Sequence, residues 1–158
     1  MLLREIKKED NPQIATVIRE VFIIENYPKT GTAFADVQLD FMFEAYRSTK
    51  SIYFVIEENN KIIGGAGINQ LDHSDENICE LQKMYFLPEA RGRGIGLQLI
   101  QKCLAKAKEF GYEKCYLETL PVMLNAQNLY KKVGFEYLSE PLGGTGHTSC
   151  PVWMIKQL

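Results

Sequence analysis

The sequence predicts a single α/β domain in which helices flank a mixed sheet, and three observations support this. The chain has 158 residues, the length of one ordinary domain. Its apolar segments follow the order strands, helix, strand, helix, strands, which differs from the strict alternation of a doubly wound parallel sheet. Hydrophobic residues make up 46% and charged residues 24%, as is usual for globular proteins. We therefore expect residues 1–158 to form one domain.

The N-terminal third alternates short apolar segments with polar turns. Residues 3–6 are expected to form an opening strand, and residues 10–12 (Asp-Asn-Pro) are typical of the cap and first turn of a helix that runs to Val21. Residues 26–35 include a proline, a glycine and two threonines, which predicts a loop. A second, weakly amphipathic helix is expected over residues 39–46.

Two apolar runs in the middle of the chain predict a hairpin. They cover residues 51–57 and 61–68 and are joined by Glu58-Asn59-Asn60, whose asparagines can supply the positive φ of a tight turn. A third strand is expected at about residues 78–86, before Pro88 ends its pairing.

The C-terminal half contains two further helices and three strands. A long helix at about residues 94–110 has apolar residues at helical spacing, and Gly111 is suited to cap its end. The remaining predicted elements are a strand at 114–119, a helix at 125–133 and strands at 135–138 and 152–155.

Charge and cysteine content exclude several classes of protein. Lys and Arg number 18 against 20 Asp and Glu, so the formal net charge of −2 favours no nucleic-acid partner. No apolar run approaches the ~20 residues of a membrane span, and the N-terminus lacks a signal-peptide pattern, so we expect a cytoplasmic protein with no membrane partner. The spacing of the cysteines suits buried free thiols better than disulfides or zinc ligands: they are Cys79, Cys103, Cys115 and Cys150.

The most informative segment is Arg91-Gly92-Arg93-Gly94-Ile95-Gly96, between a predicted strand and a long helix. Alternate glycines let backbone N–H groups turn toward one point, and the helix dipole and the two arginines would favour an anion there. The spacing fits neither the GxGxxG dinucleotide fingerprint nor a Walker A loop. A turn that merely caps the helix remains an alternative.

Two motifs resemble those of the GNAT superfamily of acetyl-CoA-dependent N-acetyltransferases. Residues 84–96 resemble its acetyl-CoA motif, Arg/Gln-x-x-Gly-x-Gly/Ala, with the core on Arg91, Gly94 and Gly96. Residues 126–135 (Ala-Gln-Asn-Leu-Tyr-Lys-Lys-Val-Gly-Phe) resemble its second signature. The resemblance covers roughly residues 51–138. It implies the GNAT fold, a mostly antiparallel sheet of six or seven strands with helices on both faces and a splayed V between the two central strands.

The resemblance also implies a site for acetyl-CoA as co-substrate. The N–H of Met84 would face the acetyl oxygen, and Phe86 would bond the pantetheine. Met123 occupies the position where many members have an asparagine that helps bind coenzyme A, and Asn125 follows two residues later, where it can bind the cofactor or instead cap its helix. The implied cofactor-binding residues are Met84, Tyr85, Phe86, Arg91, Gly92, Arg93, Gly94, Ile95, Gly96 and Asn125.

Two side chains are candidates for proton transfer. Tyr130 stands where many members have the tyrosine that protonates the coenzyme A thiolate, and a tyrosine is mostly protonated at neutral pH. Glu80 matches the strand glutamate that serves as general base in one branch of the family. A buried structural tyrosine and a solvated strand residue are the respective alternatives.

The acceptor is expected to be bound by segments outside the two motifs. These are the loop and helix of residues 26–46 and the glycine-rich stretch of residues 143–150. Their aromatic and acidic residues favour a small-molecule primary amine, while a protein or peptide acceptor and a non-catalytic acetyl-CoA sensor remain alternatives. Tyr130 argues against the sensor. His147 and Cys150 are too few ligands for a metal, so no metal is expected, and a homodimer is compatible with the family.

Overall fold

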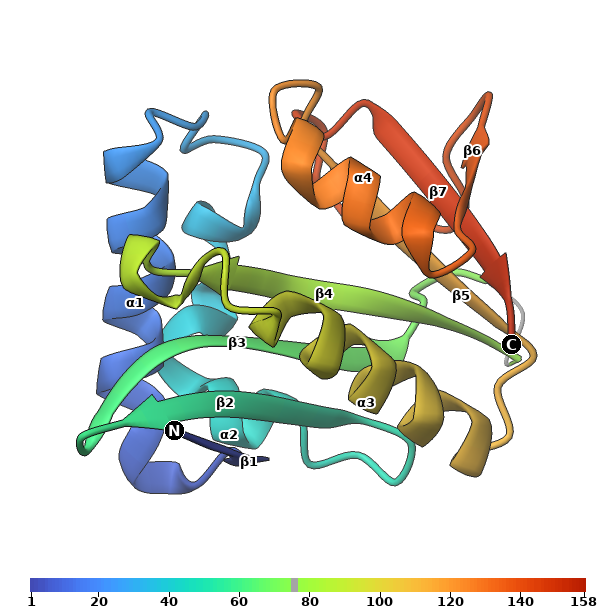
Figure 1. Cartoon of the computed structure of the whole chain (residues 1–158). Helices are drawn as coiled ribbons and strands as arrows, with labels where there is room; N and C mark the ends of the chain where they lie inside the picture. Colours follow the sequence, from blue (N-terminus) through green and yellow to red (C-terminus); the bar gives the residue numbers. More distant parts are fainter. Residues whose placement is uncertain (75–76) are drawn as a thin grey trace.

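The computed structural model describes residues 1–74 and 77–158, and a seven-stranded sheet lies at its centre (Figure 1). The spatial order is β1-β2-β3-β4-β5-β7-β6, and every pairing is antiparallel except that of β4 with β5. This confirms the mixed, mostly antiparallel sheet. The strands are β1 (Leu2–Glu5), β2 (Ile52–Glu58), β3 (Lys61–Gln70), β4 (Ile78–Phe86), β5 (Lys114–Thr119), β6 (Glu136–Leu138) and β7 (Val152–Gln157).

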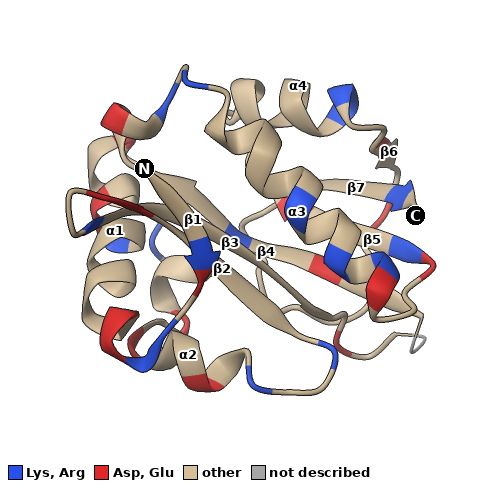
Figure 2. Cartoon of the chain, turned by 60° about the horizontal axis from the view of Figure 1, so that its bottom comes forward, with Lys and Arg blue, Asp and Glu red and all other residues tan. Residues whose placement is uncertain are grey.

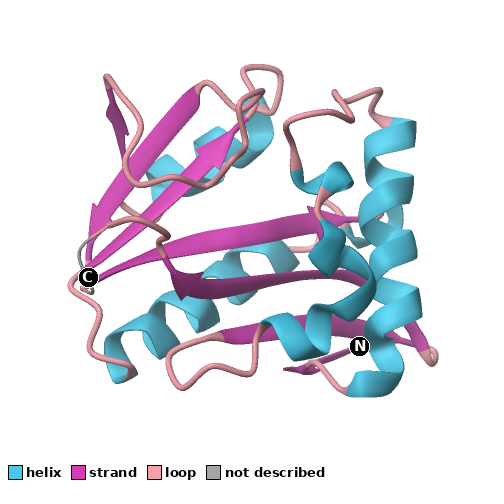
Figure 3. Ribbon diagram, turned by 180° about the vertical axis from the view of Figure 1, so that it is seen from behind, coloured by secondary structure: helices cyan, strands magenta, loops and turns pink. Residues whose placement is uncertain are grey.

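Helices cover both faces of the sheet, as the resemblance implied. The helices are α1 (Asn11–Ile24), α2 (Met42–Ala45), α3 (Ile95–Glu109) and α4 (Leu124–Lys132). Residues of α1 and α2 share one core cluster with Tyr53 and Val55, whereas α3 and α4 share another with Phe54 and Ile56. Because successive strand residues point to opposite faces, β2 is buried from both sides. Figure 3 shows the face covered by α1.

The two central strands separate after a short parallel contact. Their register pairs are Ile78 with Lys114, Cys79 with Cys115 and Glu80 with Tyr116. Beyond Glu80 the strands continue without pairing and diverge (Figure 1). This is the splayed V that the resemblance implied, and it leaves backbone groups of β4 available to a ligand.

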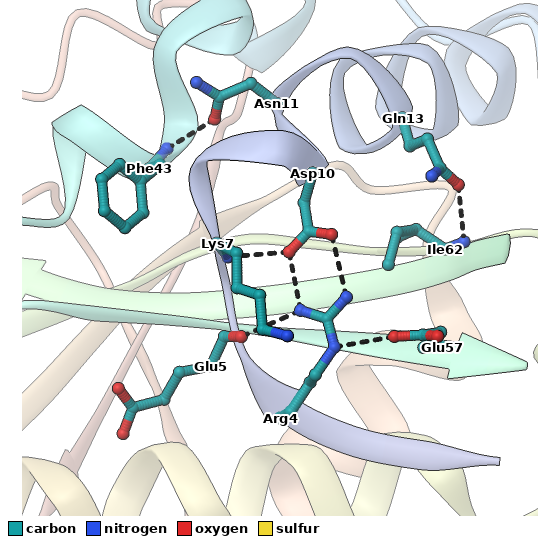
Figure 4. Close-up of polar contacts among 9 residues, drawn as sticks. All are labelled: Arg4, Glu5, Lys7, Asp10, Asn11, Gln13, Phe43, Glu57 and Ile62. Atoms are coloured by element: carbon teal, nitrogen blue, oxygen red, sulfur yellow. Dashed lines mark hydrogen bonds and ion pairs between the residues drawn. The ribbon is translucent and has the colours of Figure 1, made fainter. Parts of the chain in front are cut away.

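A polar network fixes the N-terminal segment against the sheet (Figure 4). The Arg4 guanidinium donates to Glu57 at 2.7 Å and to both carboxylate oxygens of Asp10 at 2.7 and 2.8 Å. Asp10 precedes α1, as expected of a cap, but its side chain bonds Arg4 and the Lys7 N–H instead of the helix amides. Burial alone would raise the pKa of Asp10, but these hydrogen bonds outweigh it and lower that pKa.

The hairpin turn is confirmed, whereas the second predicted helix is largely wrong. Asn59 and Asn60 have φ of 51° and 64°, as the tight turn requires. Over residues 39–46 the chain instead forms a 3₁₀ turn, Val37–Phe41, followed by the single α-turn of α2. Phe41 breaks the helix because its φ and ψ of −134° and 40° lie outside the helical region.

The cysteines are as the sequence predicts. The four cysteines are free and buried. Acidic and basic residues both occur on α1 and α3 (Figure 2), and on α3 Lys106 pairs with Glu109 at 2.5 Å. Within residues 1–74 and 77–158, none of the helices combines the length and apolar character needed to cross a bilayer.

Candidate active site

A bulge in β4 shapes the centre of the site. Gly65 of β3 pairs with Tyr85 and Gly67 pairs with Gln82, so Ala66 alone faces both Lys83 and Met84. Lys83 has a φ of 50°, in the left-handed region that residues with side chains rarely adopt. Such strain persists only where the surroundings hold it, and it is frequent at functional sites.

A cavity of about 600 Å³ opens beside the bulge, a size typical of cofactor sites. Its walls come from both arms of the V, since β4 and the start of α3 form one side and α4 forms the other. All but two of the twelve predicted site residues line it: Met84, Tyr85, Phe86, Arg91, Gly92, Gly94, Ile95, Gly96, Asn125 and Tyr130.

The glycine-rich turn presents backbone to this cavity. Gly94 is the N-cap of α3 and has a φ of 74°, so the first amides of the helix are not capped by its side chain. A Cβ added at Gly94 would meet no protein atom within 4 Å and would project into open space. Free N–H groups, a helix N-terminus and this space fit a diphosphate such as that of coenzyme A.

The two arginines of the turn have carboxylate partners. Arg93 pairs with Glu58 through bonds of 2.7 and 2.9 Å and does not line the cavity. Arg91 does line it, but its guanidinium pairs with Glu25 and donates to the carbonyl of Phe86 at 3.1 Å. Both arginines therefore hold the turn against its surroundings.

Tyr130 of α4 lies where the cavity meets a second, smaller chamber, and its side chain lines both. It is 5% exposed, and burial raises the pKa of its hydroxyl. Within the described residues that hydroxyl has no hydrogen-bond partner. Tyr130 is thus protonated at neutral pH and free to donate to a ligand.

Asn125 does not cap its helix. The N-cap of α4 is Met123, which makes no side-chain capping bond, and Asn125 lies in the first turn. Both residues line the large cavity. The capping interpretation was wrong because the chain enters α4 one residue earlier than predicted.

The smaller chamber has a volume of about 30 Å³, far less than the large cavity. It shares Met84, Tyr85, Met123 and Tyr130 with the large cavity. Its charged lining residues are Lys83 and Glu118.

The two segments expected to bind an acceptor meet at this chamber. Thr32 and Cys150 line it, and Ser149 donates through its N–H to Gly31 at 3.0 Å and through its hydroxyl to Thr30 at 2.9 Å. Although they are more than a hundred residues apart in sequence, the two loops therefore form one wall.

Asp36 joins these loops to β4. Its carboxylate accepts from Lys83 at 2.8 Å and lies 3.2 Å from His147 Nε2. Burial alone would lower the pKa of His147, but the hydrogen bond and charge of Asp36 raise it. Asp36 is one of the acidic residues in the segment that the sequence suggested for the acceptor. Lys83 was not identified, because alternation along a strand gives it no distinguishing signal.

Glu80 is buried with 4% exposure, and it lines neither cavity in the described chain. Gln82 donates to its carboxylate at 2.5 Å. Burial raises the pKa of Glu80 to about 7, and nearby Glu118 contributes in the same direction. A carboxyl group with this pKa is suited to accept a proton near neutral pH.

Comparisons with known proteins agree on one family. The model described as "Acetyltransferase (GNAT) family" matches residues 15–135. The chain is 41% identical to Uncharacterized N-acetyltransferase YjgM of Escherichia coli over 160 residues, which span 99% of this chain and 95% of the relative. A GNAT-family acetyltransferase structure from Staphylococcus aureus superposes with a TM-score of 0.87 at 20% identity, covering 99% and 98% of the two chains. PaiA N-acetyltransferase of Thermoplasma acidophilum, solved with coenzyme A, superposes with 0.73 at 19% identity over 99% and 98%.

Proposed function

Since the chain belongs to the GNAT family and is an acetyl-CoA-dependent N-acetyltransferase, we propose that residues 1–158 act as one domain that acetylates the primary amine of a small molecule. The acetyl donor and the amine would meet in one ternary complex. The observation that carries this proposal is the junction at Tyr130 between the large cavity and the small chamber.

The chain's residues fit coenzyme A at the large cavity. Backbone amides at Gly94 and Gly96 would hold the diphosphate, and the freed backbone of β4 would hold the pantetheine. The Met84 N–H would polarise the acetyl carbonyl, acting like the donors of an oxyanion hole. When bound, acetyl-CoA supplies the thioester carbonyl that the amine attacks and the thiolate that leaves.

Two proton transfers complete the exchange of the C–S bond for a C–N bond. The Tyr130 hydroxyl donates its proton to the leaving sulfur and is reprotonated from solvent. Glu80 accepts the excess proton of the attacking amine through an intervening water, because Glu80 is buried and is not among the described residues that line the chamber. Its pKa of about 7 leaves it partly ionised, and so able to act as a base, at neutral pH.

The two joined loops favour a small acceptor over a protein. An extended peptide needs an open groove, whereas Thr32 and Cys150 wall the chamber and the bonds from Ser149 to Thr30 and Gly31 link the two segments. The test is a screen of small amines and peptides for release of free thiol from acetyl-CoA. We expect turnover with small amines, and turnover with peptides alone would contradict the small-molecule assignment.

A further inference from the structure

The small chamber carries opposite charges on two walls. Lys83 comes from the β4 bulge, and Glu118 comes from β5 on the other arm of the V. Among the described residues no ion pair within 4.0 Å joins the two, although they line the same space of about 30 Å³. A cation and an anion held apart across so small a space are complementary to a ligand that carries both charges close together.

The basic wall retains capacity to bind an anion. The Lys83 side chain is only 3% exposed, and its ammonium has three N–H donors, of which one bonds Asp36 at 2.8 Å. Asp36 is shared, because its other oxygen lies 3.2 Å from His147. One carboxylate therefore serves two basic groups, and Lys83 keeps N–H donors that can bond a further carboxylate.

The acidic wall is held in place by its own hydrogen bonds. Glu118 accepts from the Tyr116 hydroxyl at 2.8 Å and from the Thr145 hydroxyl at 2.7 Å, one bond to each carboxylate oxygen. Each oxygen keeps a lone pair that can accept from an ammonium. Thr145 belongs to the C-terminal loop, so that loop orients Glu118 as well as Asp36, through His147.

We propose that the acceptor is a zwitterionic α-amino acid whose ammonium lies against Glu118 and whose carboxylate binds Lys83. The two charges of such a molecule are separated by a single carbon, which suits so small a chamber. Its side chain would extend toward the joined loops. This inference rests on the proposed acetyltransferase function and specifies its substrate class.

The experiment compares matched acceptors with the wild-type protein. The proteinogenic L-α-amino acids are each tested beside their α-amides and their decarboxylated amines, with thiol release and product mass as readouts. We expect the best amino acid to exceed both analogues by ~100-fold or more in kcat/KM. The decarboxylated amine offers the buried Lys83 donors no acceptor, and the amide offers them an acceptor without the negative charge. An amine, an amide or a peptide with a free N-terminus that equals the best amino acid overturns the inference while the acetyltransferase function stands. No turnover of any acceptor overturns both.

Two variants test whether Lys83 binds the carboxylate of the acceptor. Lys83→Met should reduce the preference for the amino acid over its decarboxylated amine to within ~10-fold, because the carboxylate then loses its cation. Lys61→Met is the control, since Lys61 is exposed at the hairpin turn, and it should keep the full preference. Calorimetric titration with coenzyme A verifies that each variant keeps its cofactor site. An unchanged preference in folded Lys83→Met overturns the role of Lys83.

Discussion

The Tyr53 hydroxyl donates a hydrogen bond of 2.8 Å to the carbonyl oxygen of Lys83, in the β4 bulge. The Tyr53 ring crosses β3 where that strand has no side chains: a Cβ at Gly65 would lie 2.6 Å from the ring, and a Cβ at Gly67 would lie 2.5 Å from it. These glycines make room for a brace beneath the bulge. The brace fixes the left-handed backbone of Lys83 and so positions the adjoining N–H of Met84.

Removing this brace should impair turnover more than cofactor binding. Tyr53→Phe keeps the ring but loses the hydroxyl, so the bulge loses a buried hydrogen bond and the Met84 N–H is less well aligned. We expect kcat to fall ~10-fold or more and the free energy of unfolding to fall by ~1 kcal/mol. Steady-state kinetics and urea unfolding measure the two effects.

Tyr112→Phe is the matched control for Tyr53. The Tyr112 hydroxyl also donates to a backbone carbonyl, that of Lys50 at 2.9 Å, but it lies outside both cavities. Its removal should cost similar stability and leave kcat unchanged. Equal losses of kcat in the two variants would show that the Tyr53 bond stabilises the fold without positioning the site.

Gly94→Ala should weaken coenzyme A binding ~10-fold or more, because the new Cβ projects into the cavity where the diphosphate approaches. Gly111→Ala gives the control, since Gly111 also has a positive φ, of 84°, and open space around it, but it follows the far end of α3. Both variants should lose similar stability. Calorimetric titration that gives equal coenzyme A affinities for the two would refute the phosphate-binding turn.

Tyr130→Phe should lower kcat by ~100-fold or more while acetyl-CoA binding stays nearly intact, because only the proton donor is lost. Tyr137→Phe serves as control: its hydroxyl bonds Gln127 at 2.8 Å on the exposed strand β6. Rates of Tyr130→Phe within about twofold of wild type would exclude the acid role.

Ionisation of the buried Glu80 carboxyl group should lower the free energy of unfolding as the pH rises. The pKa of Glu80 in the folded state is about 7, above the ordinary value of 4.5. Between these pH values the carboxyl group is ionised in the unfolded state but still protonated in the folded state, so the free energy of unfolding falls as the pH rises. The penalty reaches roughly 3 kcal/mol above pH 7. Glu80→Gln should therefore gain stability relative to wild type at pH 8 but not at pH 4.5, as measured by urea unfolding. Equal differences at both pH values would refute the raised pKa.

The same variant tests the base. In wild type, kcat/KM should rise through an apparent pKa near 7 as Glu80 ionises. In Glu80→Gln the rise of kcat/KM near pH 7 should disappear. The difference in kcat/KM between variant and wild type should shrink as the pH approaches the pKa of the amine. A wild-type profile in Glu80→Gln would assign the proton to another acceptor. Asp36, Lys83, Gln82, His147 and Glu118 surround Glu80 or its partners, so the wild-type profile belongs to the group as a whole.

Sequence patterns predicted the parts of the fold that depend on local interactions. The Asn59-Asn60 turn and the start of α3 at Gly94 follow from residues suited to positive φ. The segment from Val37 to Ala45 was predicted less well, because its apolar residues pack against α1 as a 3₁₀ turn and a single α-turn, without a regular helix.

The parts of the site that depend on contacts between distant residues could not be predicted from the sequence. The family motifs located the large cavity, which arises within one contiguous strand-turn-helix unit and α4. The small chamber combines Thr32, Lys83, Glu118 and Cys150, which are far apart in the sequence. Their proximity depends on how the loops fold over the diverging strands, and no local pattern encodes it. Glu80 was found through the motif, but its burial and its separation from the chamber were not predictable.

Because the contact between β4 and β5 is short, the two halves of the sheet should differ in the free energy of local unfolding. Among the described residues, three register pairs join the arm of β1–β4 to the arm of β5–β7. In amide hydrogen exchange the C-terminal arm should open as a cooperative unit at lower free energy than β2–β4. Coenzyme A would contact α3 on one arm and α4 on the other. Coenzyme A binding should therefore slow amide exchange in both arms together. The bound co-substrate would then connect the two arms over a region where β4 and β5 do not pair.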